Sequence, residues 1–144
     1  MTVGMLSACG SDEDVASKDM GEEPVMVDIE ELTSSAWSLR FGGAPSGDVV
    51  LVDGFPVTIT FDADGTLTGT ASCNGYGGSY TLDFNDITLS DLAVQERACE
   101  ADVQAAESTF IEGLLDVNGI NLLDDELVLS GSGTELIFGR TSVD

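Results

Sequence analysis

A glycine-rich stretch, residues 71–82, lies between two runs of alternating residues and constrains the fold more than any other feature. Apolar or small residues recur at every second position from Leu67 to Cys73 and again from Tyr80 to Phe84. A period of two is typical of a half-buried β-strand. Glycines tolerate positive φ or a close backbone approach, and the stretch contains Gly75, Gly77 and Gly78. The pattern therefore predicts two strands joined by a glycine-rich turn.

Two interpretations of this stretch are open. It is either a structural corner that fixes strand register, with Asn74 capping the turn, or an exposed recognition loop in which Asn74, Tyr76 and Tyr80 contact a ligand. Residues typical of turns most often only make turns, which favours the structural corner. The glycine spacing matches no phosphate-binding motif.

One later segment changes period. Apolar residues at helical spacing from Val103 to Val117 predict an amphipathic helix, with Glu100 near its start and Asn118-Gly119 as its stop. Further short strands are predicted at residues 37–41, 49–52, 57–61, 87–89, 120–123, 126–129 and 135–138. The sequence thus predicts a mostly β (α+β) fold in which one amphipathic helix packs on an antiparallel sheet.

The first nine residues end in Leu6-Ser7-Ala8-Cys9, which resembles the bacterial lipobox, whose cysteine carries the lipid. The apolar run before Cys9 is shorter than a signal peptide needs and lacks Lys and Arg, so we interpret residues 1–9 as a truncated signal. A chance cysteine in a frayed terminus is the alternative. Residues 10–34 are rich in Asp, Glu, Ser and Gly and predict a disordered acidic tether. Residues 35–141 form the predicted folded domain.

The chain is strongly acidic, with 27 Asp and Glu against four Lys and Arg and a formal net charge of −23. The part from Trp37 onward holds eighteen of the acidic residues and three arginines, which gives −15. Nucleic-acid binding and docking onto an anionic lipid surface by charge both depend on basic residues, so the sequence argues against them. A basic partner or a high-salt medium is compatible with this charge.

The absence of histidine excludes Ser-His-Asp triads and histidine metal sites. Acid–base chemistry would have to use carboxylates, and the candidates are Asp62 with Asp64 and the run Asp124-Asp125-Glu126. The first pair also suggests calcium, but Ala71 stands where a calcium loop needs its glutamate. A hairpin turn with Gly65 at positive φ explains the same residues. The sequence predicts no catalytic residue, no metal and no cofactor.

Several of these segments together resemble the META domain family, also called HslJ-like. The resemblance is carried by the signature Cys73-Asn74-Gly75-Tyr76-Gly77-Gly78-Ser79-Tyr80, with support from Trp37-Ser38-Leu39, residues 57–61 and Ala98-Cys99. It departs from the family at Ser72, where glycine is usual, and at Gln95, where threonine is usual. It implies a compact antiparallel β-barrel-like domain with one helix over residues 35–141, often on bacterial lipoproteins that are linked with heat shock and envelope stress. No catalytic activity is established for the family.

Cys73 and Cys99 are predicted to form a disulfide. The chain has three cysteines, and lipidation of Cys9 leaves an even pair. Disulfides persist outside the cytoplasm, which is where a lipoprotein domain would lie. Two buried free thiols are the alternative, and a zinc site is weaker because two cysteines supply half of its ligands.

The expected function is that of a non-enzymatic cell-envelope lipoprotein domain. It would be a monomer, held outside the cytoplasm at the membrane by lipidated Cys9, and would contact a protein or small-molecule ligand in the envelope. A carboxylate-dependent hydrolase and a passive surface spacer are the alternatives.

Overall fold

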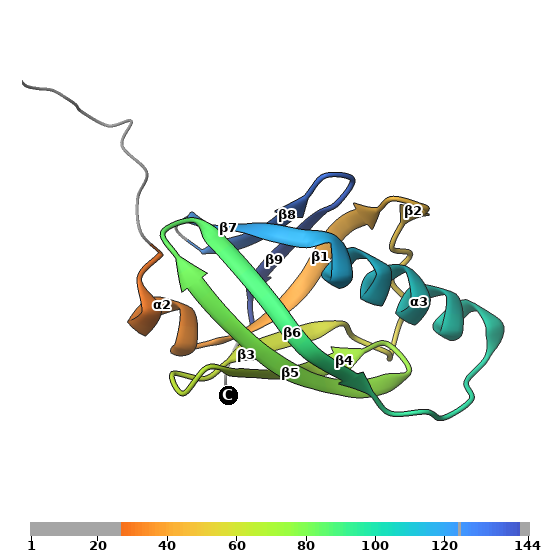
Figure 1. Cartoon of the computed structure of the whole chain (residues 1–144). Coiled ribbons are helices and arrows are strands. Elements are labelled where there is room, and N and C mark those ends of the chain that lie inside the picture. Colours follow the sequence, from red (N-terminus) through yellow and green to blue (C-terminus); the bar gives the residue numbers. More distant parts are fainter. Residues whose placement is uncertain (1–26, 124, 142–144) are drawn as a thin grey trace, which may run out of the picture.

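The computed structural model describes residues 27–123 and 125–141, and its strands form one antiparallel sheet that closes into a barrel (Figure 1). The helices are α2 (Ile29–Thr33) and α3 (Ala101–Asp116). The strands are β1 (Ala36–Ala44), β2 (Gly47–Asp48), β3 (Thr58–Phe61), β4 (Thr66–Ala71), β5 (Asn74–Asp83), β6 (Asp86–Val94), β7 (Val117–Leu123), β8 (Glu126–Gly131) and β9 (Glu135–Arg140). The predicted class, a mostly β barrel with one amphipathic helix packed on it, is confirmed.

Pairing between β1 and β9 closes the ring. From β3 to β9, each strand pairs with the one that follows it, and β1 lies between β3 and β9. Leu39 of β1 is opposite Phe138 of β9, and Trp37 is opposite Arg140. Strand β2 pairs with the last residues of β1 and forms a short hairpin outside the ring. Eight strands therefore make the barrel, and β2 is an extension of it.

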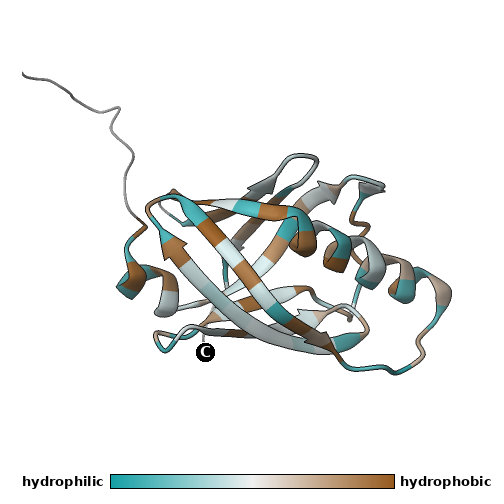
Figure 2. Cartoon of the chain, in the orientation of Figure 1, coloured by the Kyte–Doolittle hydropathy of each residue, from teal (hydrophilic) through white to brown (hydrophobic). Residues whose placement is uncertain are grey.

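Large apolar side chains fill the barrel. Trp37, Phe61, Phe110 and Phe138 are completely buried. The ring centroid of Phe110 lies 5.7 Å from that of Tyr76 and 6.2 Å from that of Phe138, both in edge-to-face contact, which the ring quadrupoles favour. Hydrophobic and hydrophilic residues alternate in bands along β6, as expected for a strand with one face inward (Figure 2).

Helix α3 packs across one end of the barrel, as the sequence predicts (Figure 1). Its buried face consists of Val103, Ala106, Phe110, Gly113 and Leu114. The predicted stop at Asn118-Gly119 is wrong, because the helix ends at Asp116 and the chain continues directly into β7. Val117 is buried and extended, and Gly119 pairs with Ser130 of β8, so sheet pairing decides where the helix ends.

Helix α2 lies at the other end of the barrel (Figure 1). Leu32 is completely buried there, and the indole Nε1 of Trp37 donates a hydrogen bond to its carbonyl oxygen at 3.1 Å. The last part of the predicted tether, residues 10–34, is therefore ordered from α2 onward. Two features of the sequence indicate this helix although the composition is that of a tether. They are the apolar Leu32 and the Asp28 side chain, which accepts from Glu30 N as an N-cap.

Arg140 at the end of β9 binds α2 to the barrel. Its guanidinium lies 4.8 Å from the centre of the Trp37 ring. It donates to Glu31 at 2.6 Å, to Ser35 Oγ at 2.8 Å and to Asp125 at 3.1 Å. One partly exposed side chain thus joins α2, β1, β9 and the β7–β8 turn.

Two aromatic residues that the alternating pattern places in the sheet interior are exposed instead. Phe41 is 58% exposed because the register of β1 against β9 shifts between Leu39 and Phe41, so that Arg40 and Phe41 both lie outside. Phe84 is 57% exposed because it occupies the β5–β6 turn at a φ of 56°. A bulge and a tight turn therefore each end the period of two earlier than the sequence indicates.

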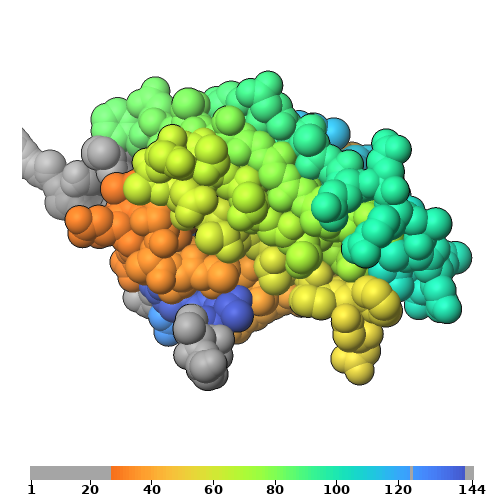
Figure 3. Space-filling view, turned by 90° about the horizontal axis from the view of Figure 1, so that it is seen from below, coloured from red at the N-terminus to blue at the C-terminus, as the bar shows by residue number. Residues whose placement is uncertain are grey.

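Residues 49–52 are predicted to be a strand but are irregular, and the strand in this region is β2 at Gly47–Asp48. The segment between β2 and β3 turns at Gly54, which has a φ of 87°. It stands out from the body of the molecule (Figure 3), and Val50 is 70% exposed on it. The isolated bridge between Val52 and Phe55 is the only regular pairing within this described segment.

The glycine-rich stretch is a strand and not a turn. Gly75, Gly77 and Gly78 lie in β5, and none of them has a positive φ. A Cβ on Gly78 would lie 2.8 Å from the Ser90 carbonyl oxygen, so this glycine is needed for close packing of β5 against β6. The turn itself is the pair Ser72-Cys73, with Ser72 at a φ of 73°. Ser72, where the resemblance leads us to expect glycine, therefore occupies the strained position.

We expect Ser72→Gly to stabilise the domain by about 1 kcal/mol, because a non-glycine residue in the left-handed region stores strain that glycine relieves. The control is Ser72→Ala, which removes the weak 3.4 Å hydrogen bond from Ser72 Oγ to Phe55 O but keeps the Cβ. Urea unfolding of both variants measures the difference. A glycine variant no more stable than the alanine variant would contradict this account.

Candidate functional site

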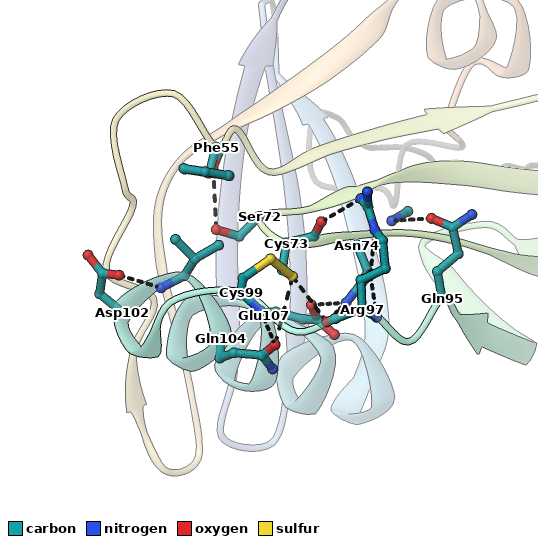
Figure 4. Close-up of a disulfide and its surroundings, with 12 residues drawn as sticks. Phe55, Ser72, Cys73, Asn74, Gln95, Arg97, Cys99, Asp102, Gln104 and Glu107 are labelled. Carbon is teal, nitrogen blue, oxygen red and sulfur yellow. Dashed lines mark hydrogen bonds between the residues drawn. A yellow bond between two sulfur atoms is a disulfide. The ribbon is translucent and has the colours of Figure 1, made fainter.

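A disulfide ties the turn between β4 and β5 to the segment that leads into α3 (Figure 4). Cys73 and Cys99 are joined with their Cα atoms 6.0 Å apart, as the sequence predicts. The N–H of Cys99 also donates to Gln104 Oε1 of α3 at 3.0 Å. The bond therefore fixes the start of the helix against the corner of the barrel.

Asn74 is the polar centre of this corner and is 2% exposed. Its Nδ2 donates to Glu107 Oε1 at 2.8 Å and to the Arg97 carbonyl oxygen at 3.2 Å. Its Oδ1 accepts from the Arg97 N–H at 3.0 Å, and Arg97 Nη2 donates to the Cys73 carbonyl oxygen at 3.1 Å. Every polar atom of the Asn74 side chain therefore has a partner within the chain, and none is left for a ligand.

Tyr76 and Tyr80 point into the barrel, and each is 6% exposed. The hydroxyl of Tyr76 donates to the Thr58 carbonyl oxygen at 2.7 Å, and that of Tyr80 donates to the Asp62 carbonyl oxygen at 2.6 Å. Burial raises the pKa of the Tyr76 phenol far above its usual value, so this group stays neutral. The three residues of the possible recognition loop thus act in this structure as interior hydrogen-bonding groups, which favours the structural corner.

The candidate carboxylates make contacts typical of turns. Asp64 accepts from the hydroxyl of Thr66 at 2.7 Å and from its N–H at 3.1 Å, and these bonds lower the pKa of the Asp64 carboxyl. Gly65 has a φ of 95°, as the hairpin interpretation requires. Asp125 pairs with Arg140, while Asp124 lies outside the described residues. Within residues 27–123 and 125–141, no group of three acidic or cysteine side chains could hold a metal ion.

A groove of about 660 Å³ lies on the surface at the end of the barrel near β2. It lies between the β1–β2 hairpin and the β8–β9 turn, which Figure 1 shows side by side. Its lining residues are Phe41, Gly42, Gly43, Ala44, Asp48, Val49, Gly131, Ser132, Gly133, Thr134, Glu135 and Ile137. Sequence reasoning missed this groove, because its walls come from segments about ninety residues apart.

Asp116, the last residue of α3, positions one wall of the groove. Its carboxylate accepts from Thr134 Oγ1 at 2.8 Å, from the Gly133 N–H at 2.9 Å and from Ser132 Oγ at 3.1 Å. These bonds lower the pKa of the Asp116 carboxyl, and the Gly133 N–H contributes most. Gly131 completes the fit, because a Cβ there would collide with the Asp116 carbonyl oxygen.

Cys9, the predicted lipidation site, lies outside the described residues, as do the rest of residues 1–9 and most of the tether. Among the helices of residues 27–123 and 125–141, none is long and apolar enough to cross a membrane.

These features define a class: a small, disulfide-bonded, closed antiparallel barrel with a helix packed across one end. A family model, the META domain, matches residues 30–143. The chain therefore belongs to the META domain family. No match was found among curated proteins.

Solved structures show the same fold. An NMR structure of a protein from Burkholderia xenovorans superposes with a TM-score of 0.63 at 21% identity, over 89% of this chain and 100% of that one. A second NMR structure has a TM-score of 0.62 at 21% identity, over 79% of this chain and 95% of the other. A crystal structure of a DUF4847 family protein from Bacteroides vulgatus has a TM-score of 0.58 at 17% identity, over 81% of this chain and 100% of that one.

Loss of the disulfide should destabilise the domain by about 3 kcal/mol, because the bond closes a loop across a sequence separation of 26. The paired substitution Cys73→Ala with Cys99→Ala, studied by urea unfolding, measures this loss. Wild type unfolded in reductant is the matched control and should behave as the double variant does. If the double variant and the reduced wild type each lost less than about 1 kcal/mol of stability, the Asn74 hydrogen bonds alone would hold the corner.

Asp116→Asn should weaken the fall in the domain's melting temperature as the pH is lowered. The pKa of Asp116 is lowered in the folded state, so its contribution is fully present above the unfolded value of about 3.9 and is lost as the pH falls through the folded value. The difference in melting temperature between wild type and Asp116→Asn should therefore be constant above about pH 5 and should shrink below about pH 4. Asp53→Asn removes an exposed charge in the loop as a control. An unchanged difference down to pH 2 would contradict the assignment.

Proposed function

We propose that this chain is a non-enzymatic domain of the cell envelope, held outside the cytoplasm by lipidated Cys9, that acts by binding a partner on the outside of the barrel. The observation that carries the proposal is the Cys73–Cys99 disulfide, because such bonds persist in oxidising compartments. The lipobox-like Leu6-Ser7-Ala8-Cys9 supports the same location.

Binding by the exterior is favoured over a catalytic role by where the polar groups lie. The buried hydroxyls of Tyr76 and Tyr80 and the amide of Asn74 are committed to partners inside the chain. Among the described candidate carboxylates, Asp62 and Asp64 both accept from the Thr66 hydroxyl in an exposed turn, which occupies them within the chain. Asp125 pairs with Arg140, and Glu126 begins β8 opposite Gly139. A hydrolase would need two carboxyl groups facing one substrate atom.

The location is tested by expressing the gene together with the codons that precede Met1. Wild type should fractionate with membranes, Cys9→Ala should be soluble, and Ser7→Ala should behave as wild type. Thiol alkylation of the unreduced, denatured protein should leave Cys73 and Cys99 unmodified. Membrane association of Cys9→Ala equal to that of wild type would refute the anchor.

The binding role is separated from that of a passive spacer by photo-crosslinking in intact cells. A photoreactive residue is placed singly at exposed positions around the barrel, such as Phe41, Thr68, Thr88 and Asn121. A binding domain should give crosslinks confined to neighbouring strands, because a docked partner covers one face. Crosslinks at no position, or equally at all of them, would favour the spacer.

A further inference from the structure

Two carboxylates flank a glycine on three adjacent strands at the groove. Gly43 of β1 is opposite Asp48 of β2 on one side and Glu135 of β9 on the other. Directly opposite residues in an antiparallel sheet face the same side, and both acids are exposed and line the groove. Since strands lie about 4.8 Å apart, the Cα atoms of Asp48 and Glu135 are about 10 Å apart.

The missing side chain at Gly43 keeps the space between the acids open. Gly43 does not have a positive φ, so the backbone conformation does not require glycine. A Cβ there would lie 2.9 Å from Asp48 Oδ1, which shows that the Asp48 carboxylate leans over this position. The hollow is thus bounded by negative charge and has bare backbone as its floor.

An apolar pair continues the groove two residues further along the strands. Phe41 is opposite Ile137, and both line the groove on its outer side. The bulge after Leu39 turns Phe41 outward, where it is 58% exposed. An exposed aromatic face beside carboxylates is suited to a cation that carries an apolar stem.

We infer that this groove binds an arginine or lysine side chain on a basic, partly apolar segment of a partner protein. The stem lies along Phe41 and Ile137, and the positive group lies between Asp48 and Glu135. The inference rests on the proposed function and names the face and the class of partner that it uses.

Charge complementarity selects this occupant over others. The domain carries −15, so its field attracts a basic segment and repels an acidic one. A neutral apolar ligand would desolvate two carboxylates without offering them a hydrogen-bond donor or a positive charge. A guanidinium offers several donors in a planar fork and can face both carboxylates at once.

The test uses the full chain and a defined probe, a blocked pentapeptide of alternating leucine and arginine, in isothermal titration calorimetry. A matched peptide with citrulline in place of arginine keeps the shape and removes the charge. The arginine peptide should bind, and the citrulline peptide should bind at least tenfold more weakly. Equal binding of the two would overturn the inference that the occupant is cationic.

Variants locate the binding. Asp48→Asn with Glu135→Gln should raise Kd about tenfold, and Phe41→Ser should raise it about threefold. The control is Asp83→Asn with Asp86→Asn, which removes two directly opposed acids beside the exposed Phe84 on the β5–β6 hairpin. This control should change Kd less than twofold, although its change in net charge is the same.

Equal weakening by both double variants would mean diffuse attraction to the acidic surface and would overturn the groove as the site. Absence of measurable binding of the arginine peptide would overturn the inference as well. Neither result would overturn the proposed function, because the crosslinking experiment tests that function without the peptide. Crosslinks confined to strands away from β1 and β9 would place the partner on another face.

Discussion

The hydrogen-bonded pairing of the first long strand with the last is the constraint on which the rest of this structure depends. It makes β1 a neighbour of both β3 and β9, so that Trp37 and Phe138 meet in one interior. A sheet closed in this way still has two open ends. Helix α3 fills one with Phe110, and α2 fills the other with Leu32. The disulfide and Arg140 then act at these ends, each joining a helix to the barrel.

Closure of the barrel also determines which polar side chains can contact another molecule. Interior polar groups need partners within the chain because water does not reach them, and Asn74, Tyr76 and Tyr80 all have such partners. The most distinctive part of the sequence is therefore used to build the fold. Groups free to meet another molecule lie where the regular pattern breaks, as at the β1 bulge that exposes Phe41. In a barrel of this size, irregularities of the strands are the features that distinguish one outer face from another.

Much of the fold follows from local pattern, and most of the candidate site does not. The period of two located β3, β4 and the β8–β9 hairpin, and the helical period located α3, because each depends on neighbouring residues. The predicted helix stop at Asn118-Gly119 and the predicted turn at the glycines of β5 are wrong, because tertiary packing decides the conformation of these residues. The groove depends on Gly43 being opposite both Asp48 and Glu135. That register is a property of the closed sheet, and no local pattern encodes it.

The contacts that close the barrel join residues far apart in sequence. Ser38 meets Thr141 across 103 positions, and Glu31 meets Arg140 across 109. Barrel closure through such long-range contacts makes folding slow, because the entropy cost of closing the long loop comes before the contacts stabilise the chain. A chain that emerges from a ribosome or a membrane channel with its N-terminus first has no complete barrel until β9 is free. The barrel therefore cannot close until its last strand, six residues long, has emerged, so closure is the final event of folding.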